Sequence, residues 1–172
     1  MNAALVLGVG NSLLGDDGVG VHVVRFLVDN PPCAVNCKIV DGGTLSFTLA
    51  SEVEETDALI VIDAANLGEA PGSVRVFVGD AMDDFVANRR SRSVHEVCLL
   101  DLLTVLALNG DLPSKRALIG VQPTHIGWEH NLSPAVQASV VVVAAKVDDL
   151  LMRWGCADLT TEPFRQGCGE LA

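Results

Sequence analysis

The sequence predicts a three-layer α/β domain in which helices cover both faces of a mostly parallel sheet. Short apolar runs alternate with segments of helical periodicity along most of the chain, as expected for such a sheet. Apolar residues make up 49% of the 172 residues, and aromatic residues only 4%. Val, Ile, Leu and Ala must therefore fill the core, as they commonly do in parallel sheets that are buried on both faces.

Five segments are predicted to be strands of this sheet: residues 3–9, 37–40, 58–62, 73–77 and 117–121. The fourth segment alternates apolar and polar residues, and no helix fits between it and the third. Because a parallel strand needs a crossover connection, the fourth strand is predicted to be an antiparallel edge strand.

Helical periodicity predicts the segments that connect these strands. A helix over residues 18–30 ends before Pro31, because proline cannot continue a helix. Residues 94–108 form an amphipathic helix. The last helix covers residues 134–154 and has Pro134 in its first turn, where proline is favoured.

Three segments carry weaker signals. Residues 46–54 are predicted to form a short helix, and the polar residues 79–92 are expected to be mobile. Residues 155–172 show no periodicity, so we expect a flexible tail after a single domain of residues 1–154.

The formal net charge of −11 restricts the classes of partner. It argues against nucleic acid, because phosphate binding needs clustered Lys and Arg, and against anionic membrane surfaces. It permits a metal ion or a basic protein surface. No secretory signal is visible, and Lys146, Asp148 and Asp149 interrupt the apolar run at 136–151, so no membrane span is expected.

The five cysteines are an odd number and include no C-x-x-C pair. This pattern favours reduced thiols in a cytoplasmic protein. A disulfide between Cys156 and Cys168 that closes the tail is the alternative.

The loop after the first strand contains part of a dinucleotide-binding fingerprint. In the pattern G-x-G-x-x-G the third glycine would stand at position 13, which is Leu13. Asp16 and Asp17 lie at the start of the next helix, where a phosphate would otherwise bind, and would repel a pyrophosphate. Nucleotide binding is therefore disfavoured.

Carboxylates stand at the ends of predicted strands and at this helix start. One of Asp16 and Asp17 is enough to cap the helix, so the other is free to point into a cleft. Asp63 ends the third strand, at the edge where open α/β sheets bind ligands. An Asx-turn is the alternative role for Asp63.

The motif Asp41-Gly42-Gly43-Thr44 follows the second strand at the same edge. Its glycines allow unusual backbone torsions and the close approach of another chain. Taken alone it is an ordinary turn motif, but beside the other carboxylates Asp41 adds a further polar group to one site.

His95 is predicted to lie in the first turn of a helix, because Ser93 and Glu96 form a capping box. The positive helix end keeps its imidazole neutral and able to bind a metal. With Asp17 and Asp63 it would suit a divalent metal with open positions. The alternative is a partly buried structural histidine.

The remaining histidines carry weaker signals. His22 lies between valines in a helix and is expected to be structural. His125 and His130 flank Trp128 in the loop after the fifth strand. This loop could form one wall of the cleft with Trp128 as a contact surface, or its histidines could simply be solvated.

In these motifs the chain resembles the NiFe-hydrogenase maturation endopeptidases, an aspartic-type peptidase family. The resemblance covers residues 3–151. It is carried, in order, by GVGNSLLGDDGVG at 8–20, DGGT at 41–44, the strand ending in Asp63-Ala64, the histidine at 95, GVQP at 120–123 and LSPAV at 132–136.

The resemblance implies an α/β/α sandwich with a twisted five-stranded sheet. It also implies a single cut that removes the C-terminal extension of the hydrogenase large-subunit precursor once nickel is in place. The implied metal contacts are Asp17, Asp63 and His95, and the nickel is carried by the precursor and bound weakly or not at all by the isolated enzyme. The family uses Glu or Asp at the first of these positions.

The resemblance also places Asp41 near the cleavage site. The expected catalytic residues are Asp41 and Asp17, and the expected substrate contacts are Gly42, Gly43 and Thr44. A water activated by the metal or by a carboxylate would attack the scissile carbonyl, or the metal would serve recognition only, with a carboxylate as base. A non-catalytic nickel-binding chaperone of the same fold is the alternative. The protein is expected to be a cytoplasmic monomer.

Overall fold

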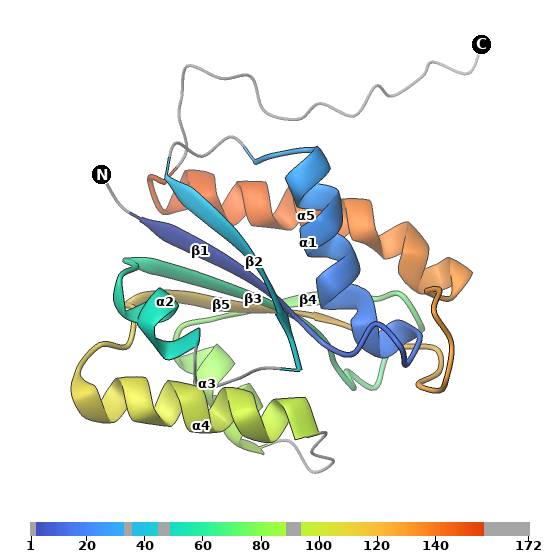
Figure 1. The fold of residues 1–172 in the computed structure, drawn as a ribbon, viewed down its shortest axis with the longest axis horizontal. Coiled ribbons are helices and arrows are strands. Elements are labelled where there is room, and N and C mark those ends of the chain that lie inside the picture. The colour runs from blue at the N-terminus through green and yellow to red at the C-terminus, as the bar shows by residue number, and fades with distance from the viewer. Residues whose placement is uncertain (1–2, 33–35, 45–48, 89–93, 157–172) are drawn as a thin grey trace.

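The computed structural model of the chain describes residues 3–32, 36–44, 49–88 and 94–156, without the side chains of residues 94–98. Within these residues a five-stranded sheet lies between two layers of helices (Figure 1). One layer contains α1 (Val19–Asp29) and α5 (Pro134–Arg153). The other contains α2 (Ala50–Glu54), α3 (Asp80–Asn88) and α4 (Val94–Asn109). The predicted three-layer α/β/α class is confirmed.

The strands follow the order β2-β1-β3-β5-β4 across the sheet. They are β1 (Ala4–Val9), β2 (Cys37–Gly43), β3 (Ala58–Ala64), β4 (Val74–Val78) and β5 (Lys115–Val121). All neighbours are parallel except β4 and β5, which are antiparallel. The prediction of an antiparallel edge strand is confirmed.

Alternate residues of the central strands build two cores. Val6 and Ile60 face α1 and α5, whereas Leu5 and Leu59 face the layer of α2, α3 and α4. Every residue of β3 is buried. This explains why the strand has no polar residue until Asp63, since each side chain before it must pack against a helix layer.

Glycines let helix α1 lie unusually close to the strands beneath it. A Cβ atom added to Gly20 would lie 2.5 Å from the backbone nitrogen of Val9 and even closer to the carbonyl oxygens of Val9 and Ile62. A Cβ added to Gly8 would meet the backbone of Gly20. The close packing at Gly8 and Gly20 fixes the start of α1 over the ends of β1 and β3.

The prediction of a mobile segment at 79–92 is wrong for the residues that the structure describes. Asp80–Asn88 forms helix α3, and residues 89–92 lie outside the described residues. Met82 and Val86, one turn apart, are buried against the core. Phe85 stacks on Phe77 of β4 with ring centroids 3.9 Å apart. These contacts hold a helix whose sequence is mostly polar.

The last described residues pack onto the domain. Cys156 is buried, and the Nζ atom of Lys115 donates a hydrogen bond to the carbonyl oxygen of Trp154 at 2.7 Å. Residues 157–172 of the predicted tail, including Cys168, lie outside the described residues. No helix in the described part of the chain is long and apolar enough to cross a membrane.

Candidate functional site

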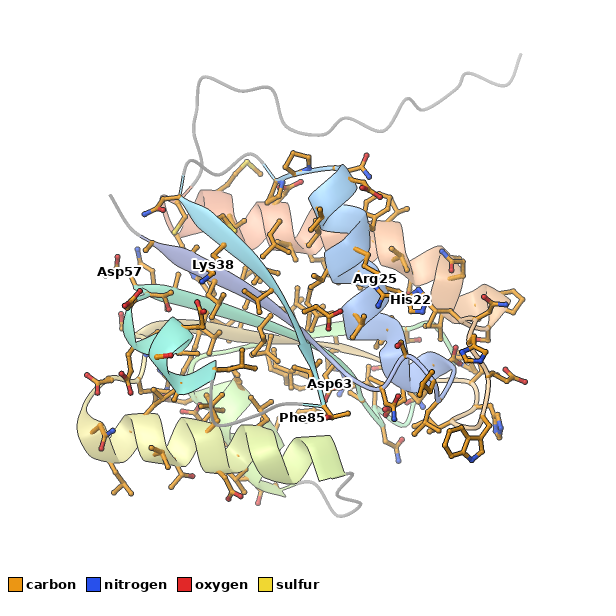
Figure 2. The ribbon with its side chains drawn as sticks, in the orientation of Figure 1. His22, Arg25, Lys38, Asp57, Asp63 and Phe85 are labelled. Atoms are coloured by element: carbon orange, nitrogen blue, oxygen red, sulfur yellow. The ribbon has the colours of Figure 1, made fainter. Side chains whose placement is uncertain are left out.

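Two buried carboxylates mark the edge where the parallel strands end. Asp17 lies in the short 3-10 helix η1 (Asp16–Gly18), which follows β1 and contacts β3. Asp63 is the next-to-last residue of β3 and pairs in register with Gly120 of β5. Figure 2 shows Asp63 at the end of the sheet where α1 begins. Asp17 is only 5% exposed and Asp63 only 3%.

The loop before η1 fixes the position of Asp17. Its Oδ2 atom accepts a hydrogen bond from the backbone nitrogen of Asn11 at 2.9 Å. The close packing of α1 on β1 brings η1 onto β3, so segments far apart in the sequence supply Asp17 and Asp63. A buried pair of carboxylates at a sheet edge is a donor set that suits a divalent cation.

The structure describes only the backbone of the predicted third ligand, His95. His95 lies in the first turn of α4, as predicted, but its side chain and the predicted cap residue Ser93 lie outside the described parts. Because α4 runs back along the sheet before β5 begins, its first turn lies toward the edge where the parallel strands end (Figure 1). Among the described side chains no group of three potential ligands is close enough to hold a metal ion.

Of the residues predicted to contact substrate, Gly42 and Gly43 belong to β2, which extends three residues further than expected, and Thr44 lies in the turn after it. The Oδ1 atom of Asp41 accepts a hydrogen bond from the nitrogen of Gly43 at 3.0 Å, and its Oδ2 lies 3.7 Å from a guanidinium nitrogen of Arg25. A Cβ atom added to Gly42 would lie 2.7 Å from the side chain of Leu7 in the same chain. Gly43 has a positive φ of 48° and open space beside it.

Asp16 has a role that the sequence did not reveal. Neither η1 nor α1 has a side-chain cap hydrogen bond, so helix capping, the alternative role of this pair of aspartates, is not observed. Asp16 instead accepts hydrogen bonds from the backbone nitrogens of Thr124 at 2.8 Å and Ser133 at 2.7 Å. It also accepts bonds from the nitrogen of His125 at 3.3 Å and the Ser133 hydroxyl at 2.8 Å.

These bonds explain the ionisation of Asp16. Burial alone would raise its pKa, but the hydrogen bonds from Ser133, Thr124 and His125 outweigh burial and lower the pKa below the ordinary value. The partners lie more than a hundred residues away in the sequence. No local pattern links them to Asp16, and the only available signal was the presence of a second aspartate.

His22 is a half-buried residue outside this site, with its Nε2 atom buried. Its Nε2 atom has no hydrogen-bond partner among the described residues. Burial lowers its pKa, and the nearby charge of Arg25 lowers it further. Figure 2 shows His22 and Arg25 on α1, away from Asp63.

Comparisons with known proteins show the family of the chain. Residues 21–149 match the family model of the hydrogenase maturation protease HycI. The chain is 34% identical to the hydrogenase expression/formation protein HupD of Rhodobacter capsulatus over 152 residues, covering 88% of this chain and 72% of HupD. It is also 34% identical to the hydrogenase 2 maturation protease of Escherichia coli, covering 79% of this chain and 82% of that protein.

A solved structure shows the same fold. The hydrogenase maturating endopeptidase HybD from E. coli superposes with a TM-score of 0.82 and 32% sequence identity. The match covers 89% of this chain and 94% of HybD.

Proposed function

Since the chain belongs to the hydrogenase maturation protease family, we propose that it removes the C-terminal extension of a NiFe-hydrogenase large-subunit precursor that already carries nickel. The observation that supports this most strongly is the buried pair Asp17 and Asp63 at the carboxyl edge of the sheet. Carboxylates are rarely less than a tenth exposed, so two of them at a ligand-binding edge indicate a functional site.

In this proposal the nickel belongs to the substrate. Asp17, Asp63 and His95 complete its coordination when the precursor docks, so the protease reads whether the metal is present. Carboxylate and imidazole ligands both suit nickel. The isolated protein is then expected to contain little nickel, because the precursor supplies the remaining ligands.

The cut itself is an aspartic-type hydrolysis in this proposal. Asp41 lies at the exposed end of β2, where the extension can reach it. A carboxylate there takes a proton from water as the water oxygen bonds to the scissile carbonyl carbon. The carbon–nitrogen bond then breaks, and the proton passes to the leaving amine. The backbone nitrogen of Gly43 donates a hydrogen bond that orients this carboxylate, and a guanidinium nitrogen of Arg25 lies 3.7 Å from it.

The experiment measures the intact mass of a nickel-loaded, C-terminally extended large subunit after incubation with the protein. A nickel-free precursor serves as the control. A single mass loss that needs nickel supports a metal-checking endopeptidase. Binding of the precursor without any mass loss would contradict the proposal and indicate a nickel-binding chaperone.

Variants test the residues assigned to the site. Asp63→Asn and His95→Ala are each expected to lower processing at least about a hundredfold, because each removes a ligand. Asp149→Asn is the matched control for Asp63→Asn, because it removes the same charge. Asp149 lies on α5, where it forms an ion pair with Arg153. Circular dichroism checks that each variant is folded, and full processing by His95→Ala would overturn the assignment.

Localisation and assembly follow as parts of the same proposal. We expect a monomeric protein that acts in the cytoplasm, where the cysteine thiols stay reduced. Size-exclusion chromatography with light scattering would give the mass of the assembly, and a stable dimer would contradict this part.

A further inference from the structure

Two loops that lie far apart in the sequence are joined beside the site. Residues 124–133, after β5, run alongside the loop that leads from β1 to η1. The backbone nitrogen of Gly15 donates to the carbonyl oxygen of Glu129 at 2.7 Å. The nitrogen of Glu129 donates to Leu13 at 3.2 Å, and the nitrogen of Gly127 donates to Leu14 at 3.4 Å. The two loops are therefore joined by backbone hydrogen bonds, with one isolated parallel bridge and one isolated antiparallel bridge.

Asp16, which follows the loop that leaves β1, binds the other loop through hydrogen bonds. It is only 2% exposed, and its two oxygens accept four hydrogen bonds from the 124–133 loop. Both ends of that loop are held, by Thr124 with His125 at the start and Ser133 at the end. Hydrogen bonds to a buried carboxylate are among the stronger ones in proteins, so the loop is pre-organised.

The joined loops present three exposed apolar side chains. Trp128 is 85% exposed, Ile126 is 48% exposed and Leu13 is 47% exposed. Trp128 is one of two tryptophans in a chain with few aromatic residues, and it is almost fully exposed. Exposed aromatic anchors on a rigid support are typical of protein-binding surfaces.

We propose that Leu13, Ile126 and Trp128 form a docking surface for the folded body of the precursor, and that Asp16 is the positioning residue that holds this surface. The proposal rests on the proposed function, because it takes the precursor as the partner. We call these three residues the apolar dock.

The position of the apolar dock indicates which part of the precursor meets it. The 124–133 loop leaves β5 and reaches back to the loop before η1, so the dock adjoins the segment that carries Asp17. In the proposed function the extension runs to Asp41 at the end of β2, and the nickel that Asp17 contacts is held by the body of the precursor. The body therefore covers Asp17 and the dock beside it.

This placement predicts a change in substrate affinity without a change in chemistry. Trp128→Ala is expected to raise KM at least about tenfold, since truncating a central aromatic anchor typically has an effect of that size or more. Its kcat should stay within about threefold of wild type, because the carboxylates are untouched. Leu108→Ala is the matched control: Leu108 is 82% exposed near the end of α4, at the opposite end of the sheet, and KM should not change.

The role of Asp16 is tested by a double-mutant cycle. Asp16→Asn should raise KM severalfold, and the Asp16→Asn/Trp128→Ala double variant should show no further rise over Trp128→Ala, because Asp16 acts through the dock. Independent, additive effects would show that Asp16 is only a structural residue and would overturn its assigned role.

A spectroscopic readout tests the same role without substrate. The chain has two tryptophans, so Trp154→Phe leaves Trp128 as the single emitter. In this background Asp16→Asn should lower the fluorescence anisotropy of Trp128, because the loop gains motion. Unchanged anisotropy would overturn the claim that Asp16 holds the loop.

The choice of occupant is tested with a synthetic peptide of the extension sequence. The peptide should inhibit the wild type and Trp128→Ala equally, because it binds on the Asp41 side. Weaker inhibition of Trp128→Ala would show that the extension, not the body, meets the dock. Failure of the wild type to cut any nickel-loaded precursor contradicts the proposed function, whereas cutting with an unchanged KM in Trp128→Ala contradicts this inference alone.

Discussion

Replacing Gly20 with alanine should destabilise the protein, although helix propensity predicts the opposite. In an ordinary helix this change gains about 1 kcal/mol, because glycine is a poor helix former. Here the new Cβ would lie 2.5 Å from the backbone nitrogen of Val9, where contacts begin near 3.4 Å. Because the crowded atoms are backbone, α1 must move away from the sheet by roughly 0.9 Å to relieve the overlap at that atom.

This displacement sets the size of the effect. The displacement would loosen the packing of the five buried apolar side chains of α1: Val19, Val21, Val23, Val24 and Leu27. At about 2 kcal/mol each they contribute roughly 10 kcal/mol, and a gap of this size forfeits a quarter to a half of the contact energy. After the gain in helix propensity, the net loss is about 1.5–4 kcal/mol.

Urea unfolding measures this loss. With a slope of about 2 kcal/mol per M, the unfolding midpoint should fall by roughly 1–2 M. Gly68→Ala is the control, because Gly68 has a positive φ of 67° and a Cβ atom added there would have nothing within 4 Å. That variant should lose only the roughly 1 kcal/mol of an unfavourable φ. A Gly20→Ala midpoint at or above that of wild type would refute the argument from close packing.

Four further predictions concern separate parts of the fold. Ile60→Ala should cost about 2–5 kcal/mol in urea unfolding, because Ile60 is fully buried; a loss below about 1 kcal/mol would contradict its core position. Arg116→Ala should speed amide hydrogen exchange in α3 at least about tenfold but not in β1, because Arg116 on β5 donates hydrogen bonds to Asp83 on α3. Burial raises the pKa of Cys37 to about 12, so its alkylation at pH 8 should be about a thousandfold slower in the folded than in the urea-unfolded protein, because the thiolate fraction falls by about that factor. The pKa of Asp16 is below its ordinary value of 3.8, so its stabilising effect exists above that value and is lost as the pH falls through the folded pKa. Asp16→Asn should therefore be less stable than wild type at pH 7, with the difference shrinking below about pH 3.8, as unfolding at both pH values would show.

The sheet could be predicted because each strand carries its own signal. The buried run that ends at Asp63 and the proline at the start of α5 are local features, and the structure has them where the pattern predicts them. The antiparallel β4 followed from the short connection before it, which leaves no room for a crossover. The predicted and observed strands differ only at their ends; β2, for example, was predicted to end at Val40 and ends at Gly43.

The parts that could not be predicted depend on contacts between distant segments. Helix α3 is polar in sequence, and its support comes from Phe77 and Arg116 in neighbouring strands. The four bonds of Asp16 likewise come from the loop after β5. The metal set remains a prediction, because it includes the side chain of His95 beyond the described residues.

The strand order has a consequence for synthesis of the chain. β4 is made directly after β3 but does not pair with it, because β5 lies between them. Its only partner in the described sheet, β5, begins roughly 40 residues later, so during translation β4 emerges without a neighbour for several seconds. The apolar sequence VRVFV is then open to pairing with other chains. We expect aggregation during expression to depend on this strand. Helix α3 precedes β5 in the sequence and packs on β4 through Phe85, so we expect it to be the first element that shields β4.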